Sequence, residues 1–218
     1  LGFFTGIELA LQPLPAHRVL GVCHFPTFRA AMEATPRIVT LGPSAVELVD
    51  STMIDLARDI PAYGSIIDRF VVGRPAALLL VEFAGDDAPA QHRGLARLVE
   101  MMGDLGHPGA VLEATDDRFQ RDVWEVRKAG LNIMMSMKGD GKPVSFIEDC
   151  AVRLDDLADY TERLTDVFDR HGVVGTWYAH ASVGCLHVRP VLNMKDGGDV
   201  GKMRTIAEEA FAMVREYK

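Results

Sequence analysis

Apolar runs and helix-like patterns follow one another in a fixed order along the first half of the chain. Four short, mostly apolar runs predict strands, and they cover residues 17–25, 45–50, 76–84 and 110–114. Between the third and fourth runs, apolar residues at turn spacing predict a helix within 85–106, which Asp86 or Asp87 can cap. A shorter helix is expected after Pro26, and Pro36 should interrupt or end it. The order strand, helix, strand, strand, helix, strand is that of a split βαβ, or ferredoxin-like, unit.

The second half of the chain begins the same order again. A helix is expected over about 117–135, followed by the glycine-rich loop 138–143. After the loop, the pattern predicts a strand, an amphipathic helix, two strands and a helix, over residues 144–152, 154–172, 176–182, 185–191 and 199–218. In the amphipathic helix, Leu157, Leu164 and Phe168 should point inward. We therefore predict an α+β fold of duplicated ferredoxin-like units with an antiparallel sheet, the second unit truncated at its C-terminus.

The two ends of the chain suggest a piece of a longer protein. Residues 3–12 alternate loosely and predict a strand that finishes at Pro13 and Pro15. There is no initiator methionine or signal peptide, and the last helical pattern stops without a cap. We divide the chain into a leading tail, a first ferredoxin-like half, a connecting helix and loop, and a second, incomplete half, over residues 1–16, 17–115, 116–145 and 146–218.

Composition narrows the classes of function. The net charge is −8 and no block of Lys and Arg occurs, which argues against nucleic acid as a partner. No apolar run approaches the roughly 18 residues that a transmembrane segment needs. Cys23, Cys150 and Cys185 are far apart and form no CxxC pair, so neither a disulfide framework nor structural zinc is expected. These features favour a reducing, cytoplasmic location, although the intact protein could attach peripherally to a membrane.

The stretch YAHASVGCLHVRP places His180 and His187 on two neighbouring predicted strands. If Val183 and Gly184 form a two-residue hairpin loop, the two histidines face each other with Cβ atoms about 4.5–5.5 Å apart. Two neutral imidazoles so placed can share one metal ion, such as zinc, manganese or iron. Nothing local supplies a third ligand, however. The alternative is that both histidines hydrogen-bond within a polar sheet face, and the spacing alone does not separate the two hypotheses.

Arg127 is a candidate for binding an anion. On the predicted helix, Trp124 and Arg127 are three residues apart and share a face. A guanidinium beside an aromatic wall can hold a carboxylate through two parallel hydrogen bonds. The alternative is an ordinary surface arginine that pairs with Glu125 or Asp122.

Three other polar residues attract attention for their positions. Lys142 could reach an anion from its glycine-rich loop, but a flexible surface loop is the simpler interpretation because no P-loop pattern is present. Glu148 and Asp149 are adjacent on a predicted strand, so their side chains should point to opposite faces and cannot form a carboxylate pair. One of them could instead pair with Arg153.

The segment AHASVGCLH resembles the GHxGDGNLH segment of the FAD-linked oxidases of the vanillyl-alcohol-oxidase type. This family includes D-lactate dehydrogenases, the glycolate oxidase D subunit and D-2-hydroxyglutarate dehydrogenase. The stretches AVELVD, LLLVEF, WEVRKAG and FIEDCAV precede that segment in the expected order. The resemblance covers essentially the whole chain, as the C-terminal, substrate-side domain. Leu1 and Gly2 resemble the end of the Gly-Thr-Leu-Gly turn that closes the FAD-binding domain, so residues 1–16 would be the tail of that domain.

The resemblance implies roles for the candidate residues. His180 and His187 would hold a divalent metal that binds the hydroxyl and carboxylate of the substrate, and Arg127, in the WxxR motif, would bind the carboxylate. The third metal ligand of the family is a Glu in a Ser-x-Glu-His-Gly segment beyond residue 218, and the next His is its proposed general base. No catalytic residue is therefore expected within this chain. FAD would be bound mainly by the preceding domain.

The implied function is that of an FAD-dependent dehydrogenase that oxidises a D-2-hydroxy acid, of the D-lactate or glycolate type, by hydride transfer to flavin. This piece alone should be inactive, and a quinone, a cytochrome or an iron–sulfur centre would accept the electrons. The sequence departs from the family at Ser182, Val183 and Cys185, which replace Gly, Asp and Asn. Cys185 is a candidate soft ligand, and Val183 disfavours a turn that requires positive φ. These changes keep open the alternative of a non-catalytic ferredoxin-like domain for small-molecule binding or assembly.

Overall fold

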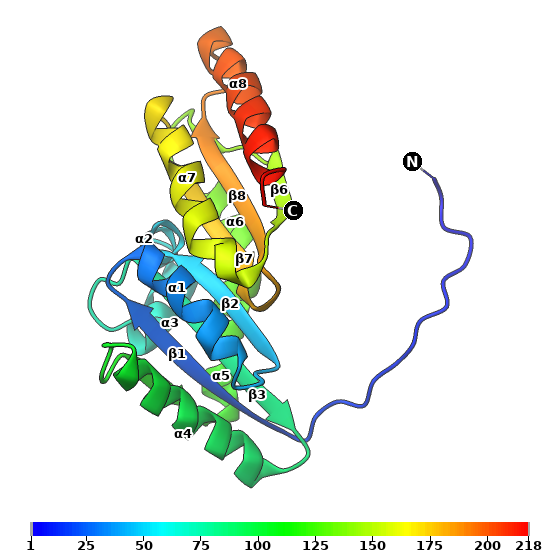
Figure 1. Cartoon of the computed structure of the whole chain (residues 1–218), viewed down its shortest axis with the longest axis vertical. Helices are drawn as coiled ribbons and strands as arrows, with labels where there is room; N and C mark the ends of the chain where they lie inside the picture. The colour runs from blue at the N-terminus through cyan, green and yellow to red at the C-terminus, as the bar shows by residue number, and fades with distance from the viewer. Residues whose placement is uncertain (1, 218) are drawn as a thin grey trace.

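The structure of the chain, a computed structural model that describes residues 2–217, is an eight-stranded sheet with helices packed on both faces (Figure 1). All neighbouring strands run antiparallel. The sheet is continuous across two units of the same topology, so the chain forms one body. The helices cover the sheet differently in these two units.

The first unit contains β1 (His17–Phe25), α1 (Phe28–Val39), β2 (Ala45–Asp50), β3 (Ala77–Gly85), α4 (Ala88–Asp104) and β4 (Val111–Ala114). Its strands lie in the order β4-β1-β3-β2, which is the ferredoxin-like order. Asp87 caps α4, one of the two predicted alternatives. Pro36 lies inside α1, so the prediction that it would interrupt or end this helix was wrong. Met32 and Ile38 on either side of it are fully buried, and this packing keeps the last turn helical.

Four helices cover the other face of this unit. They are α2 (Ser51–Arg58), α3 (Pro61–Phe70), α5 (Asp117–Lys128) and α6 (Gly130–Met135). The first two were not predicted, and the last two replace the single helix expected over 117–135. Asp50 begins α2 by accepting a hydrogen bond from the Met53 backbone N–H at 2.8 Å, and Pro61 occupies the first turn of α3.

The second unit contains β6 (Ile147–Ala151), α7 (Leu157–Arg170), β7 (Gly175–His180), β8 (Cys185–Leu192) and α8 (Gly197–Val214). Its strand order β6-β8-β7 repeats β1-β3-β2, and the short strand β5 (Lys142–Pro143) extends the same edge of β8. β7 pairs with β2, which joins the two units in one sheet. In the part of the chain that the structure describes, this unit has no counterpart of β4. The predicted α+β fold of duplicated ferredoxin-like units, the second truncated, is therefore confirmed.

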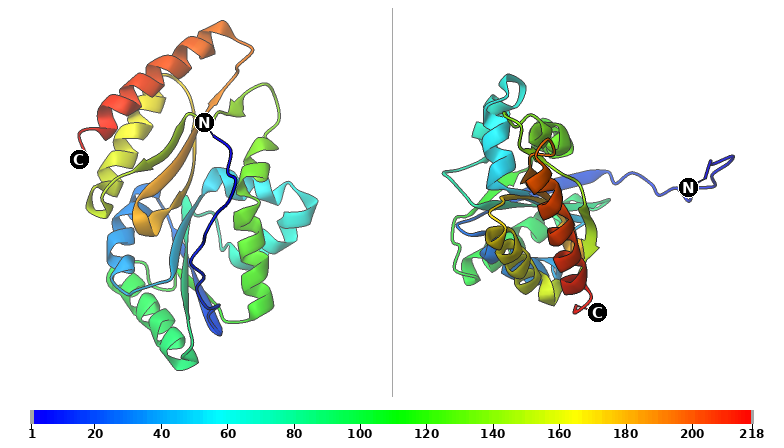
Figure 2. Two further views of the ribbon diagram at one scale, coloured as in Figure 1. Left: turned by 90° about the vertical axis from the view of Figure 1, so that its right-hand side faces the viewer. Right: turned by 90° about the horizontal axis from the view of Figure 1, so that it is seen from above.

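The two faces of the sheet have separate cores. α1, α4, α7 and α8 lie on one side along both units, whereas α2, α3, α5 and α6 lie on the other side (Figure 2). Leu157, Leu164 and Phe168 of α7 are buried in the first core, as predicted. In β8, every second residue is buried toward α7 and α8, and the residues between them are partly exposed on the other face. The second unit therefore presents a polar, accessible sheet face beside α5 and α6.

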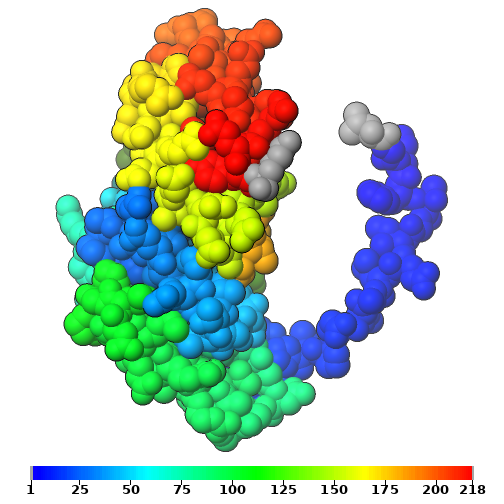
Figure 3. Space-filling view, in the orientation of Figure 1, coloured from blue at the N-terminus to red at the C-terminus, as the bar shows by residue number. Residues whose placement is uncertain are grey.

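Residues 2–16 form no strand and extend away from the body of the protein (Figures 1 and 3). The prediction of a strand over 3–12 was wrong: the backbone of this segment pairs with no strand among the described residues. Phe3, Phe4 and Leu11 are almost fully exposed. The expectation about Leu1 lies outside the described residues.

Candidate functional site

The hairpin between β7 and β8 differs from the predicted one in its register. His180 lies opposite Cys185, and Tyr178 lies opposite His187. The connection is a 3₁₀ turn over Ala181–Val183, followed by Gly184 at φ 66°. The prediction that His180 directly faces His187 across a two-residue loop was therefore wrong. The left-handed residue is the glycine, so the valine before it takes an ordinary conformation.

Gly184 is required at this position for a second reason. A Cβ atom there would overlap the backbone carbonyl oxygen of Val152. The backbone of Gly184 instead accepts a hydrogen bond from the Val152 N–H at 3.2 Å. This close approach fixes the end of the hairpin against the end of β6 and so fixes the positions of both histidines.

His180 and His187 lie side by side in spite of the changed register. They are diagonal neighbours on one sheet face, with ring centroids 5.2 Å apart and an interplanar angle of 84°. The ring of Tyr178 lies 4.8 Å from that of His187 and supports it from the other side. His180 is half exposed, whereas the side chain of His187 is only 16% exposed. The pair therefore forms a compact, accessible group of two imidazoles.

Glu47 of β2 connects Arg127 with His180. Its carboxylate accepts a hydrogen bond from Arg127 Nη2 at 2.6 Å and contacts His180 Nδ1 at 2.9 Å. The side chains of Arg127 and Glu47 are 11% and 14% exposed, so water screens this pair only weakly. Neither Asp122 nor Glu125, the partners considered from the sequence, pairs with Arg127: they pair with Arg69 and Lys128 respectively. Arg127 thus points at the sheet rather than into solvent.

Glu148 of β6 makes an equivalent connection on the other side of the pair. One of its oxygens accepts from Arg189 Nε at 2.6 Å and from Ser145 Oγ at 2.8 Å, while the other lies 2.9 Å from His187 Nδ1. The guanidinium carbons of Arg189 and Arg127 lie 5.5 Å and 5.2 Å from the centre of the Tyr178 ring. Two cationic groups therefore lie close to one aromatic ring.

Arg127 keeps one buried donor unsatisfied. Its Nε is buried and has no hydrogen-bond partner among the described residues. Leaving such a donor unpaired costs about 1–3 kcal/mol, and more for a charged group. Trp124, one turn earlier on α5, donates its ring N–H to Glu82 at 3.1 Å, so both side chains point toward the sheet as the spacing predicted. Arg127 therefore keeps hydrogen-bonding capacity beyond its ion pair with Glu47.

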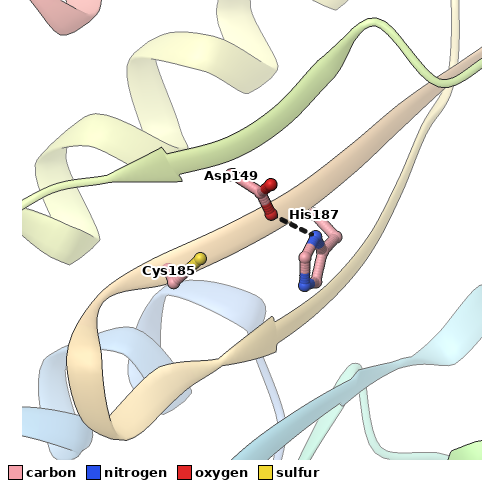
Figure 4. Close-up of side chains that lie close together, drawn as sticks. All are labelled: Asp149, Cys185 and His187. Carbon is pink, nitrogen blue, oxygen red and sulfur yellow. Dashed lines mark ion pairs between the residues drawn. The ribbon is translucent and has the colours of Figure 1, made fainter. Parts of the chain in front are cut away.

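Asp149, Cys185 and His187 form a second group of possible metal ligands (Figure 4). One ligand atom from each lies within 4.8 Å of the others. Asp149 Oδ1 is 3.3 Å from His187 Nδ1, but the Asp149 side chain is 77% exposed. Burial raises the pKa of the Cys185 thiol, and the nearby Asp149 carboxylate raises it further. The two imidazoles, each held at Nδ1 by a glutamate, are the better candidates for ligands.

Asp149 also explains why one prediction about β6 failed. Adjacent strand residues normally point to opposite faces, but Glu148 and Asp149 both contact His187 Nδ1. The strand is irregular between Ile147 and Cys150, and Asp149 has φ 55°. This bulge turns both carboxylates toward the same histidine. Arg153, considered as their partner, contacts neither and lies 3.9 Å from Asp155.

The donor set around the histidines fits a divalent metal. Each Nδ1 is held by a glutamate, and within residues 2–217 no hydrogen bond engages either Nε2. Imidazole nitrogens suit zinc, manganese and iron, and a metal-bound histidine usually donates its other N–H to a carboxylate. Lys142, by contrast, donates to the Met137 carbonyl within its own loop.

Several residues of the site were not identified from the sequence. Glu47, Tyr178 and Arg189 stand at alternate positions of apolar strands, where a polar residue indicates only the accessible face. Their convergence depends on the β2–β7 pairing, in which Glu47 lies opposite His180. Sequence spacing gives no access to this pairing, because the two strands are 133 residues apart at that point.

Comparison with known proteins places the chain. The sequence profile described as FAD linked oxidases, C-terminal domain, matches residues 14–218. The D-2-hydroxyglutarate dehydrogenase of Pantoea ananatis is 31% identical over 226 residues, covering 100% of this chain and 22% of that protein. The mitochondrial D-lactate dehydrogenase [cytochrome] of Arabidopsis thaliana is 28% identical over 189 residues, covering 86% of this chain and 31% of that protein. The chain thus spans about a fifth to a third of the length of these relatives.

Solved structures agree with the sequence comparison at the level of the fold. A p-cresol methylhydroxylase with bound substrate matches with a TM-score of 0.63 and 12% identity, over 91% of this chain and 43% of that one. The 4-ethylphenol oxidase of Gulosibacter chungangensis matches with a TM-score of 0.60 and 14% identity, over 92% and 44%. None of the helices in the described part of the chain combines the length and apolarity needed to cross a membrane. The family suggested by the histidine segment is confirmed: this chain belongs to the FAD-linked oxidases, as a C-terminal domain of that family.

Proposed function

We propose that this chain is the substrate-side domain of an FAD-dependent dehydrogenase that oxidises a D-2-hydroxy acid. The relatives named for D-2-hydroxyglutarate and D-lactate support this substrate class. D-lactate, glycolate and D-2-hydroxyglutarate are the compounds to test first. Because the relatives are several times longer than this chain, activity belongs to the intact protein and not to this domain alone.

One observation carries the proposal: Arg127, His180 and His187 converge on the accessible sheet face of the second unit. A 2-hydroxy acid carries a carboxylate and a hydroxyl on adjacent carbons, so it needs a cation for the first group and an electrophile for the second. Arg127, with a buried and unpaired Nε, supplies the cation. The paired histidines, with ring centroids 5.2 Å apart, supply the place for the electrophile.

We assign His180 and His187 as ligands of a divalent metal, either zinc, manganese or iron. The fit rests on the two Nε2 atoms, which remain free to coordinate while each Nδ1 contacts a carboxylate. A metal held there supplies positive charge that lowers the pKa of the substrate hydroxyl. The histidines would position this metal, and Arg127 would orient the carboxylate.

FAD, held mainly by a domain other than this one, would accept the hydride from the substrate α-carbon, while the hydroxyl proton would go to a base outside this chain. This domain contributes orientation and electrostatics to that chemistry. The oxidised substrate would leave from the polar face of β7 and β8. A quinone, a cytochrome or an iron–sulfur centre would then take the electrons from the flavin.

Arg189 bears on the choice among the three substrates. D-lactate and glycolate have one carboxylate, whereas D-2-hydroxyglutarate has two. Arg189 is the second guanidinium beside Tyr178, although it is already paired with Glu148. A second cation at the site favours the dicarboxylate, so D-2-hydroxyglutarate should bleach the flavin faster than D-lactate or glycolate.

The test uses the intact protein, purified and mixed with substrate in the absence of oxygen. The flavin absorption should bleach with a D-2-hydroxy acid and remain with its L enantiomer. A His187→Ala variant should bleach at least about 100-fold more slowly, the scale expected when a metal ligand is removed. Flavin that no D-2-hydroxy acid reduces would reject the substrate class. A protein that binds no flavin would favour a non-catalytic binding or assembly domain.

A further inference from the structure

Two arginine–glutamate–histidine triads flank the histidine pair. In the first, the Glu47 carboxylate lies between Arg127 Nη2, at 2.6 Å, and His180 Nδ1, at 2.9 Å. In the second, Glu148 accepts from Arg189 Nε at 2.6 Å and lies 2.9 Å from His187 Nδ1. The two triads have the same chemistry and nearly the same distances, although their glutamates come from different units of the fold.

A carboxylate between these partners determines which nitrogen of each histidine carries the proton. An ionised carboxylate can only accept hydrogen bonds, so the Nδ1 atom that contacts it must be the protonated one. A neutral imidazole protonated at Nδ1 has its lone pair on Nε2. Both histidines are therefore prepared to coordinate a metal through Nε2 before the metal arrives.

The arginines keep each carboxylate in this role. The side chains of Arg127, Glu47 and Arg189 are 11%, 14% and 11% exposed, and that of Glu148 is 23% exposed. At this degree of burial, the short hydrogen bond from the guanidinium fixes the orientation of the carboxylate. Because an arginine occupies one side of each glutamate, the other side is left for the histidine alone.

We infer that Glu47 and Glu148 are positioning residues that fix His180 and His187 as Nε2 donors to a single metal ion. The inference rests on the metal site of the proposed function. It adds two residues on strands outside the histidine hairpin. One of them, Glu47, lies on the first unit, so the site depends on the β2–β7 seam where the two units meet.

Glutamine is the informative replacement at both positions. Its side chain has nearly the same shape as glutamate but offers one acceptor oxygen and one donor amide nitrogen. The buried arginine claims the oxygen, because a charged donor is the more costly one to leave unpaired. The amide N–H then faces the histidine Nδ1, which must accept, and the proton moves to Nε2 where it blocks coordination.

The experiment measures metal affinity in the intact protein, freed of metal with EDTA and titrated with Zn²⁺ against a fluorescent chelator. Glu47→Gln should weaken Zn²⁺ binding by about 10- to 100-fold. Glu148→Gln should do the same when combined with Asp149→Asn, because the Asp149 carboxylate, 3.3 Å from His187 Nδ1, otherwise remains as an acceptor there. Glu82→Gln is the matched control. Glu82 is a carboxylate on the neighbouring strand that accepts from a ring N–H, that of Trp124, but contacts neither histidine. The Glu82→Gln variant should bind Zn²⁺ with the affinity of the wild type.

Two further readouts separate positioning from a general structural effect. The melting temperature in EDTA should fall in both Glu→Gln variants, because each loses a largely buried ion pair with an arginine, and it therefore reports fold stability apart from metal affinity. The d–d absorption of bound Co²⁺ should change in both variants and not in the control, because it reports the ligands themselves. Should one variant fail to fold, the other triad provides an independent measurement.

The outcomes separate this inference from the proposed function. Wild-type affinity in both Glu→Gln variants, with binding abolished by His187→Ala, would overturn the positioning role and keep the metal site. Weaker Zn²⁺ binding with an unchanged d–d absorption of bound Co²⁺ would also overturn it, in favour of a general structural role. A wild-type protein that binds no Zn²⁺, Mn²⁺ or Fe²⁺ would remove both the metal site and the triads' function.

Discussion

The third strands of the two units, β3 and β8, occupy equivalent central places in the sheet but bury their side chains differently. In β3, residues on both faces are buried: Leu78 and Leu80 on the face of α2 and α5, and Leu79 on the opposite face. In β8, only alternate residues are buried, and His187 and Arg189 lie on the sheet face that Leu78 and Leu80 occupy in β3. The continuous apolar run of β3 therefore indicates a strand covered by helices on both faces, and the alternating run of β8 indicates a strand covered on one face only.

This difference explains where the candidate site lies. The helices inserted in the first unit, together with α5 and α6, cover one sheet face there, and the second unit leaves the same face accessible. The change occurs at the seam, where Val49 lies opposite Tyr178 and Glu47 lies opposite His180. The two units therefore share one sheet topology, and the different helices decide which part of the sheet stays accessible for the site. The polar groups of the second unit need not contribute to the stability of the core.

The largest effect that tests this comparison should come from truncating the covered face. Leu80→Ala should lower the free energy of unfolding by about 2–5 kcal/mol, because Leu80 is 1% exposed and its removal leaves a cavity. His180→Ala should lower it by less than about 1 kcal/mol, since its side chain is half exposed and Glu47 keeps Arg127 as a partner. Chemical denaturation of the intact protein in EDTA measures both. Equal losses would mean that the polar face belongs to the core.

A smaller effect is expected for Arg127→Lys, and it should appear in activity rather than in stability. A lysine ammonium cannot serve Glu47 and a substrate carboxylate through separate, fixed N–H groups as a guanidinium does. We expect kcat/KM for the D-2-hydroxy acid to fall by about 10- to 100-fold, the loss of one charged hydrogen bond. Lys128→Ala is the control, because Lys128 is 70% exposed and pairs only with Glu125. An unchanged kcat/KM would leave Arg127 as a structural partner of Glu47.

Local patterns were enough to predict the elements that form the shared scaffold. The apolar runs gave β1 and β2 with the observed bounds, and the order of elements gave the duplicated topology. The helices α2 and α3 were missed because their apolar faces are short and begin directly after β2, with Asp50 acting as both strand end and cap. These two helices cover one sheet face in the first unit only. Without them, the sequence could not predict which part of the sheet remains accessible.

The candidate site was predictable only as separate residues. His180, His187 and Arg127 attracted attention through spacing and resemblance, but their mutual arrangement depends on two backbone irregularities. Gly184 shifts the hairpin register, and the bulge at Asp149 turns two adjacent carboxylates toward one histidine. Both are tertiary features, because the glycine is required by the approach of Val152 from another strand. The glutamates of the two triads follow from strand pairing, which no local pattern specifies.

Asp50 links the covered and accessible units, and its effect should depend on pH. It is 4% exposed and accepts hydrogen bonds from the Met53 and Trp177 backbone N–H groups, each at 2.8 Å. Burial raises its pKa to about 6. The native state therefore holds the Asp50 proton more tightly than the unfolded state, so its contribution is greatest at low pH and declines as the pH rises from about 4 to about 6.

Comparison with Asp50→Asn isolates this contribution, because asparagine does not titrate. On lowering the pH from 7 to 5, the wild type should gain about 1 kcal/mol of unfolding free energy relative to the variant. Denaturation curves at both pH values measure the difference. A constant difference between the two proteins would mean that the two backbone N–H groups offset the burial of the carboxylate. The seam would then be insensitive to pH.

The smallest effect should come from Cys185→Ser, and it decides which of two groups of ligands the accessible face uses. The thiol lies within 4.8 Å of ligand atoms of Asp149 and His187, so Cys185 is the alternative to His180 as a ligand. If the metal is held by His180 and His187, both Cys185→Ser and Asp149→Asn should change its Kd by less than about threefold, or about 0.7 kcal/mol. Competition with a chelator measures this in the intact protein, with His180→Ala for reference. A tenfold loss in either variant, with His180→Ala unaffected, would move the metal from the seam between the units to the bulged edge at β6. The inequality of the two units would then explain the accessible face but not the ligands on it.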